Sequence, residues 1–168
     1  MIFPTNGKIR LFITGGTIDS QSIDRDGTYR FGNTHIREML EQARNEAKIR
    51  REILMLKDSA LMVDFERRII LNKCRKCRGQ KIVITHGTDS MTETAEMLGR
   101  GVRGKTIVLT GSMIPYNQKG SDALFNLGCA IAAVQLLPFG TYIAMNGRIF
   151  KWNNVRKNRA KNIFEERK

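Results

Sequence analysis

The sequence predicts a doubly wound α/β domain of the flavodoxin or Rossmann type, with a mostly parallel central sheet and helices on both faces. Apolar β-forming segments alternate with helical patterns along the chain, which is typical of βαβ units. Two of these segments, residues 11–14 (LFIT) and 82–85 (IVIT), are mainly apolar, as expected for parallel strands buried on both faces. Each leads into a turn that contains Gly-Thr. Since the carboxyl ends of parallel strands meet at one edge of a sheet, both turns are expected at that edge.

The first half of the chain is expected to contain two strands and two helices. The first strand covers residues 8–14, and the polar residues 18–32 form a long loop. Asn33 or Thr34 caps a helix that runs to Arg44. The second strand covers residues 53–56, and Asp64 caps a helix that runs to Cys77. The apolar side of this helix is expected to comprise Phe65, Ile69, Ile70, Leu71 and Cys74.

The second half continues the alternation of strands and helices. Strands are expected at residues 81–85, 105–110 and 140–145, with helices at 91–98 and 123–137. Ser121 or Asp122 caps the second of these helices, and Asn146-Gly147 is a hairpin-type turn. The residues after Trp152 form a polar, basic tail.

Length and composition indicate one domain with a real core. The chain has 168 residues, of which 41% are hydrophobic, and this excludes a disordered protein. The N-terminus has no apolar segment of signal-peptide length, and the longest apolar stretch, residues 129–137, is too short to span a bilayer. A soluble, cytoplasmic protein that does not enter membranes is therefore expected.

The chain is strongly basic, with a formal net charge of +13. Residues 44–81 carry twelve basic and five acidic side chains, and residues 148–168 carry eight and two. No nucleic-acid-binding motif accompanies this charge, which argues against nucleic-acid binding as the main function. A basic surface also favours anionic, aspartate-like groups, and the salt dependence of KM would test such attraction.

The cysteines do not indicate a metal centre. Cys74 and Cys77 form a CxxC, but His35 and His86 do not supply the further pair of ligands that a structural zinc site needs. The flanking cations favour lowered thiol pKa values and an oxidisable pair, although the motif is best explained as incidental. No metal and no organic cofactor is expected.

The two Gly-Thr turns suggest nucleophilic chemistry better than phosphate binding. Neither GxGxxG nor GxxxxGK[ST] is present. A threonine hydroxyl, from Thr17 or Thr88, is a poor nucleophile unless a neighbour takes its proton and donors await the oxyanion. Gly16 and Gly87 allow backbone N–H groups to face a bound carbonyl, and Asp89 offers a charge suited to an ammonium group.

Several segments together resemble a known family. ITGGTID at 13–19 and ITHGTDSMTETA at 84–95 resemble the two signature segments of the bacterial-type L-asparaginase family. KDSALM at 57–62, TGSM at 110–113 and NVRKNR at 154–159 resemble further segments of that family, in the same order. The resemblance covers essentially the whole chain and implies a fold like the amino-terminal domain of an asparaginase.

The resemblance implies a catalytic role for five residues. Thr17 would form a β-aspartyl ester and release ammonia from L-asparagine, after which water hydrolyses the ester. Tyr29, in the loop, would close over the site and assist Thr17. Thr88 and Lys157 would activate the attacking water or, in a rival scheme, the nucleophile itself. Asp89 would bind the α-ammonium group of the substrate.

The resemblance also implies a set of substrate-binding residues. Ser59 would bind the α-carboxylate from the turn that it shares with Asp58, and Ser112 would contact the amide through its side chain or its backbone. Gly16 and Gly87 complete the set. The residue after Ser59 is Ala60, where the family often has a polar residue.

The expected organisation is a single asparaginase-like catalytic domain over residues 1–168 with no carboxyl-terminal domain, and hence without the acidic residue that this domain normally lends to the site. The expected partners are a small amino-acid amide and further copies of the chain, as a dimer or a tetramer. Two alternatives stay open at this point. The chain could hydrolyse glutamine or another small amide, or it could bind an amino acid or a protein partner without turnover.

Overall fold

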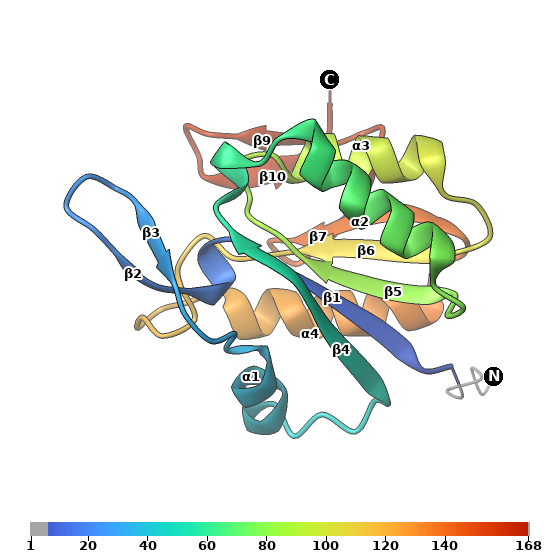
Figure 1. The fold of residues 1–168 in the computed structure, drawn as a ribbon, viewed down its shortest axis with the longest axis horizontal. Coiled ribbons are helices and arrows are strands. Elements are labelled where there is room, and N and C mark those ends of the chain that lie inside the picture. Colours follow the sequence, from blue (N-terminus) through green and yellow to red (C-terminus); the bar gives the residue numbers. More distant parts are fainter. Residues whose placement is uncertain (1–6, 168) are drawn as a thin grey trace.

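A computed structural model describes residues 7–167, in which a six-stranded sheet forms the centre (Figure 1). The strand order is β4-β1-β5-β6-β7-β8, and all neighbouring pairs are parallel except β7 with β8. The strands are β1 (Ile9–Gly15), β4 (Ile49–Lys57), β5 (Lys81–Thr85), β6 (Thr106–Thr110), β7 (Gly140–Met145) and β8 (Arg148–Lys151). Taken in chain order, the five parallel strands run 2-1-3-4-5, which is the flavodoxin-like order. The predicted fold class is confirmed.

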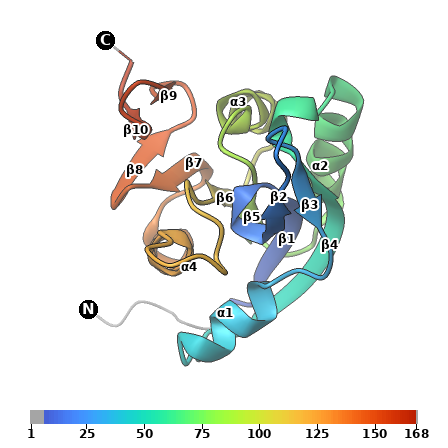
Figure 2. The same ribbon diagram turned by 90° about the vertical axis from the view of Figure 1, so that its left-hand side faces the viewer.

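Within residues 7–167, four helices cover the two faces of the sheet (Figure 2). They are α1 (Ile36–Gln42), α2 (Asp64–Lys76), α3 (Met91–Gly101) and α4 (Ala123–Leu136). Side chains of α1 and α4 share one buried cluster with Leu11 and Ile13 of β1, while α2 and α3 share the other with Phe12. Adjacent residues of β1 thus point into opposite cores, because the side chains of a strand alternate between the two faces.

The edge strand β4 is longer than the predicted segment 53–56. It pairs with β1 from Ile49 onward, but Arg50 and Arg51 lie exposed on it. An edge strand has a solvent-facing side, and charged residues there interrupt the apolar pattern by which strands are recognised. The prediction therefore found only the carboxyl-terminal half of the strand.

The predicted loop 18–32 and the predicted tail both contain secondary structure. A short 3-10 turn, η1 (Thr17–Asp19), leads into an antiparallel hairpin of β2 (Ser20–Ile23) and β3 (Tyr29–Phe31), which projects from the sheet (Figure 1). After Trp152, β9 (Arg156–Asn158) pairs with β10 (Ile163–Glu165). Phe164 of β10 is buried in the same core cluster as side chains of α2 and α3, and it anchors this second hairpin.

Two helix predictions need correction. The α1 helix begins at Ile36 after His35 and ends at Gln42, and α2 is preceded by Val63, so Asp64 is its first residue rather than its cap. On α2, Phe65 and Ile69 are exposed at 73% and 40%, whereas Ile70 and Cys74 are fully buried. The helix therefore turns a narrower face to the sheet than the sequence predicted. Within residues 7–167, no helix has the length and apolar character required to cross a bilayer.

Candidate active site

The two threonine turns lie side by side at the carboxyl ends of β1 and β5, which are neighbours in the sheet. Thr17 follows β1 through Gly15-Gly16, and Thr88 follows β5 through His86-Gly87. The connections from these two strands lead to helices on opposite faces of the sheet, α1 and α3. In open α/β sheets this switch point is the place where ligands bind.

Close backbone packing holds the turns together. Gly16 has φ of 81°, and a Cβ placed on it would lie 2.3 Å from the backbone nitrogen of Gly87. A Cβ on Gly87 would in turn lie 2.4 Å from Oγ of Ser59. Ser59 belongs to a further short 3-10 turn, η2 (Ser59–Leu61), which follows β4. Three turns from three adjacent strands therefore meet without space for side chains between them.

Lys157 reaches this site from β9. Its Nζ donates a hydrogen bond of 2.7 Å to Oγ1 of Thr88 and one of 2.9 Å to Oδ1 of Asp89. Arg159 also donates to Oδ1 of Asp89, over 3.0 Å. The site thus joins a hydroxyl, an amine and a carboxylate in one chain of contacts. The sequence separation between Lys157 and Thr88 is 69 residues, so only the fold brings them together.

The electrostatics favour an ionised Asp89. Burial opposes ionisation, but the hydrogen bonds and charges of Lys157 and Arg159 outweigh it and hold the pKa of Asp89 below its ordinary value. The carboxylate therefore remains charged at neutral pH.

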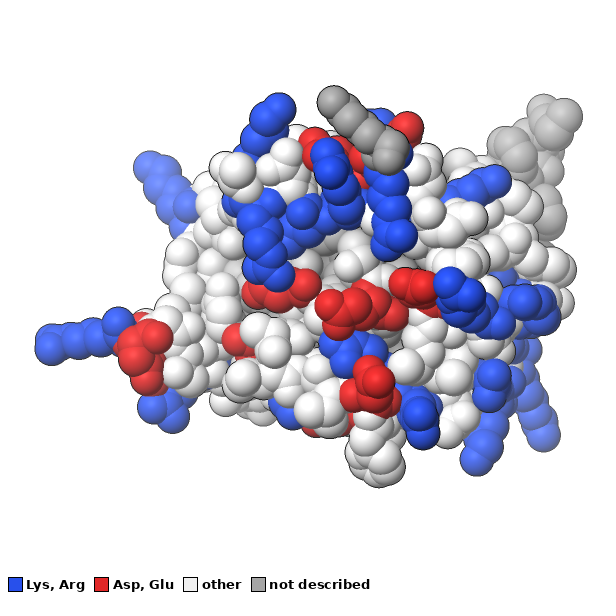
Figure 3. Space-filling model, turned by 90° about the horizontal axis from the view of Figure 1, so that it is seen from above, with Lys and Arg blue, Asp and Glu red and all other residues white. Residues whose placement is uncertain are grey.

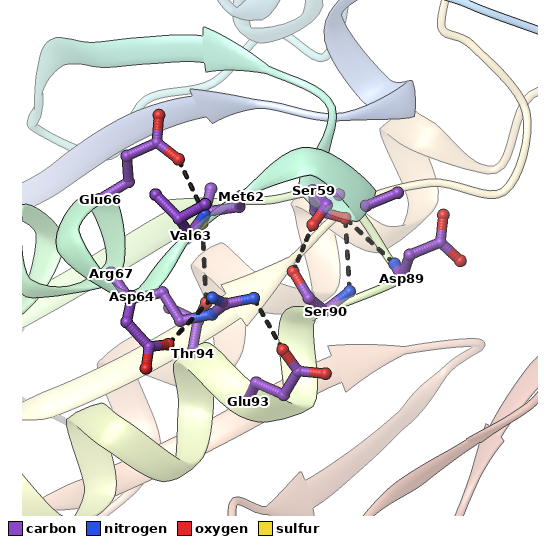
Figure 4. A network of polar contacts seen from close by, with 12 residues as sticks. Ser59, Met62, Val63, Asp64, Glu66, Arg67, Asp89, Ser90, Glu93 and Thr94 are labelled. Atoms are coloured by element: carbon purple, nitrogen blue, oxygen red, sulfur yellow. Dashed lines mark hydrogen bonds and ion pairs between the residues drawn. The ribbon is translucent and has the colours of Figure 1, made fainter.

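Ser59 is fixed against the Thr88–Asp89 turn (Figure 4). Its Oγ accepts from the backbone N–H groups of Asp89 and Ser90, and its carbonyl accepts a 2.6 Å bond from Oγ of Ser90. Asp58 accepts from the backbone N–H of Ala60 and so stabilises the turn itself. The hydroxyl proton of Ser59 has no acceptor among the described residues, and the residue is 1% exposed.

The turn after β6 contains Ser112, whose side chain is committed within the protein. Its Oγ donates a 2.7 Å bond to the carbonyl of Ile114, and the residue is fully buried. Asp122 accepts from the backbone N–H groups of Met113 and Ile114. Sequence reasoning assigned Asp122 only as a helix cap, and its role in holding this loop was missed. Only the backbone around Ser112 is left for contact with a ligand.

The structure shows no hydrogen bond between Tyr29 and the other candidates. Tyr29 lies on β3 opposite Ile23, and it makes no hydrogen bond with Thr17, Thr88 or Lys157. The side-chain oxygen of Thr17 has no hydrogen-bond partner within residues 7–167, although its backbone carbonyl accepts from Oγ of Ser20. Thr17 is 8% exposed, so its hydroxyl has limited access to solvent.

Sequence reasoning missed two buried groups that shape the site. The imidazole of His86 donates through Nδ1 to the carbonyl of Gly87 and accepts through Nε2 from Oγ1 of Thr94, both at 2.8 Å. Burial lowers the pKa of His86 to about 4 and keeps the ring neutral. Asp19 accepts from Oγ1 of Thr34 and from the backbone N–H of His35, so it ties the Thr17 turn to the start of α1. Burial raises the pKa of Asp19, although these hydrogen bonds oppose the shift.

The cysteine pair lies away from the site, on α2 and at its end. Burial raises the pKa of the Cys74 thiol to about 12, so the expected lowering by flanking cations is wrong for this residue. Cys74, Cys77 and Cys129 are free thiols. Among the described residues, no three His, Cys, Asp or Glu side chains gather closely enough to hold a metal ion.

Fold and site together define a doubly wound α/β domain in which two threonines, a lysine and an aspartate gather at the switch point between β1 and β5. The chain belongs to the asparaginase family, because residues 8–165 match the family described as "Asparaginase, N-terminal".

Named relatives agree with this membership. The chain is 32% identical over 161 residues to "Probable L-asparaginase periplasmic" of Haemophilus influenzae, with 89% of this chain and 46% of that protein covered. It is 33% identical over 146 residues to a subunit of the glutamyl-tRNA(Gln) amidotransferase of Sulfolobus acidocaldarius, covering 83% of this chain and 33% of that protein. The thermostable L-asparaginase from Thermococcus kodakarensis superposes with a TM-score of 0.79 at 29% identity, over 95% of this chain and 51% of that one. The chain thus spans about half the length of these relatives, or less.

Proposed function

We propose that the chain carries the catalytic domain of an L-asparaginase, which hydrolyses L-asparagine to L-aspartate and ammonia through a threonine nucleophile. The observation that carries this proposal is the contact of Lys157 with both Thr88 and Asp89, beside the turn that holds Thr17. Family membership supports the reaction class, since relatives named L-asparaginase match most of the chain.

In the first step, Oγ1 of Thr17 attacks the side-chain amide carbon. The carbon–nitrogen bond breaks, a proton passes to the leaving nitrogen, and ammonia departs from a β-aspartyl ester. In the second step, water attacks the ester and returns the proton to Thr17. Backbone N–H groups of the turn at Gly87 stabilise the negative carbonyl oxygen in both steps. The N–H of Gly16 does not contribute, because it already donates to the carbonyl of Lys57 over 2.9 Å.

Thr88 and Lys157 act as a base in this scheme. Nζ of Lys157 donates to both Thr88 and Asp89 in the resting site, so Lys157 must lose a proton before it acts as a base. The resulting neutral amine takes the hydroxyl proton of Thr88, while Oγ1 of Thr88 takes a proton from the attacking group. The attacking group is the water of the second step or, in the rival scheme, Thr17 itself. The 2.7 Å contact between Nζ and Oγ1 is within the range needed for such a transfer.

Substrate binding uses the remaining candidates. Asp89 receives the α-ammonium group, and the free hydroxyl proton of Ser59 is donated to the α-carboxylate. The turn at Asp58 positions Ser59, and the backbone near Ser112 contacts the amide. Tyr29 reaches the bound amide through a movement of the β2–β3 hairpin, because in its present position on β3 it makes no hydrogen bond with Thr17.

Ammonia release from L-asparagine and from L-glutamine tests the proposal. We expect release from asparagine, and a loss of about 10³-fold or more in kcat/KM for Thr17→Ala and for Lys157→Ala. Lys161→Ala is the matched control, because Lys161 is an exposed lysine of the same hairpin with no contact to Thr88. If the unmodified chain releases ammonia from neither amide, the binding-only alternative replaces this proposal.

Two further properties belong to the same proposal. We infer a cytoplasmic location, which three free cysteines support, since disulfides are rare in that compartment. Cell fractionation tests this location.

We also infer a homo-oligomer, a dimer or a tetramer, supported by exposed apolar side chains around the start of α2, among them Leu61, Val63 and Phe65. Light scattering of the purified chain measures the subunit number.

A further inference from the structure

We propose that Arg159 determines the specificity of this site by competing with the substrate's α-ammonium group for Asp89, so that the site also accepts four-carbon amides that lack this ammonium. The inference rests on the proposed function, in which Asp89 is the ammonium-binding group. It adds a residue for which the family resemblance implied no role.

The two cations share a single oxygen of Asp89. Lys157 donates to Oδ1 over 2.9 Å and Arg159 donates to the same atom over 3.0 Å. One negative charge therefore faces two positive charges before any ligand arrives. An ammonium group that binds Asp89 must approach both cations, and like charges at such separations repel.

Burial distinguishes the roles of the two cations. The side chain of Lys157 is 13% exposed and also bonds Thr88, so it is held in place. The side chain of Arg159 is 72% exposed, and among the described residues it pairs with Asp89 alone. Exposed ion pairs of this kind are weak, so a ligand can displace the guanidinium at small cost.

The β9–β10 hairpin places Arg159 at this position. Arg159 follows β9 directly, as the first residue of the turn that leads to β10, and is two residues from Lys157. The turn is fixed locally, because Oδ1 of Asn158 accepts from the backbone N–H of Lys161 and its amide donates to Glu165. These hydrogen bonds hold the turn, and the turn places the guanidinium of Arg159 within reach of Asp89.

The consequence for ligands follows from charge balance. A ligand with an α-ammonium replaces Arg159 at Asp89 and leaves the guanidinium without its partner. A ligand without it leaves the Asp89–Arg159 pair intact, and its carboxylates benefit from the nearby positive charge. Succinamic acid is asparagine without its amino group. When it binds, the charge of Asp89 is therefore already neutralised by Arg159, and no ammonium group is needed there.

Calorimetric binding of L-aspartate and of succinate tests the inference, because these two diacids differ only in the ammonium group. We expect Arg159→Gln to bind aspartate about fivefold more tightly, while its affinity for succinate stays equal or falls. Arg159→Lys keeps the charge and is expected to keep the ratio of the two affinities within about twofold of the unmodified chain. Arg156→Gln is the matched control, since Arg156 pairs with Glu165 on the same hairpin and does not touch Asp89.

An unchanged ratio of the two affinities in Arg159→Gln overturns the inference, and so does a failure of both diacids to bind. Ammonia release from asparagine and from succinamic acid, measured on the same preparations, reports separately on the proposed function. Turnover of asparagine with an unchanged affinity ratio leaves the proposed function standing without the role of Arg159. A changed ratio without turnover of either amide leaves Arg159 as a specificity residue of a binding domain.

Discussion

The imidazole of His86 has no exposed surface, and it connects the Gly87 turn to α3 through Thr94. Its pKa in the folded chain is about 4, against an ordinary value of 6.5. Between these two pH values the unfolded chain holds a proton that the folded chain does not. The free energy of unfolding should therefore fall as pH falls from 6.5 toward 4, by about 1.4 kcal/mol per pH unit and about 3 kcal/mol in total.

Urea denaturation at pH 7.5, 6.5, 5.5 and 5.0 measures this loss. The carboxylates whose pKa values are lowered, such as Asp89 and Glu66, contribute only below their ordinary values near 4. The raised pKa of Asp19 acts in the opposite direction to that of His86, so the Asp19→Asn variant is measured alongside to separate the two groups. His86→Gln is expected to be less stable at pH 7.5 and to show a flatter pH dependence from 6.5 to 5.0. An equally steep dependence in that variant would contradict the assignment.

At the residue scale, motifs identified the groups that carry the proposed chemistry. Thr88, Asp89 and Lys157 were all predicted, and they are in contact in the structure. His86 and Asp122 were missed as supports of the site, because their partners lie in other turns and no local pattern marks such hydrogen bonds. Arg159 was missed for the same reason, since a lone arginine in a basic segment resembles a solvated side chain.

The turns that follow β1 and β5 act as one element, because the backbone of Gly16 lies against that of Gly87. Gly16→Ala adds a Cβ 2.3 Å from a backbone nitrogen, at a φ of 81°. We expect it to cost more than about 3 kcal/mol in the free energy of unfolding and to abolish ammonia release. Urea denaturation and the ammonia assay measure the two effects.

Gly27→Ala is the control for this substitution. Gly27 has φ of 85°, nearly that of Gly16, but a Cβ there meets nothing within 4 Å. Gly27→Ala therefore has only the conformational cost of a positive φ, which should lower the free energy of unfolding by about 1 kcal/mol and leave activity unchanged. Equal losses in the two variants would mean that contact between the turns does not matter.

The β9–β10 hairpin is the element that positions Lys157. Phe164, directly opposite Lys157 in the pairing, is 1% exposed and donates its backbone N–H to Asn146. Phe164→Ala should lower the free energy of unfolding by about 3 kcal/mol and speed amide exchange in residues 156–165. Ile163→Ala, at a partly exposed neighbouring position, should have a smaller effect on both the free energy of unfolding and amide exchange. Hydrogen exchange that is equally fast in both variants would show that Phe164 is not the anchor.

Elements with long, apolar patterns were predicted well, and short polar ones were not. β5, α3, β6 and α4 lie close to their predicted positions, because each buries a regular set of apolar side chains in the two core clusters. β2, β3, β9 and β10 have only three or four residues each and carry many polar side chains. Such strands form because a partner strand and a single buried residue stabilise them, and neither is visible in a local window.

At the scale of the whole molecule, the charge of +13 remains after most acidic side chains have found basic partners. Glu52, for example, pairs with both Arg10 and Lys73, and Glu66 pairs with Lys57. On the face over α2, α3 and the β9–β10 hairpin, basic side chains surround a line of acidic ones (Figure 3). The excess therefore acts mainly as a long-range positive field, which salt screens over about 10 Å at 0.1 M.

This field should affect the binding of the substrate and the product of the proposed reaction differently. L-Asparagine has no net charge at pH 7, whereas L-aspartate carries one negative charge, so only the product is attracted at long range. Raising NaCl from 20 to 300 mM is expected to weaken inhibition by aspartate about two- to fivefold, with a smaller change in KM for asparagine. Steady-state ammonia release at several aspartate concentrations measures both constants.

Replacing the exposed Arg50 and Arg51 together by Gln lowers the net charge by two and should reduce the salt dependence of product inhibition. If the KM for asparagine and the inhibition constant for aspartate respond equally to salt, the attraction is local to the site, and the surface charge plays no part in it.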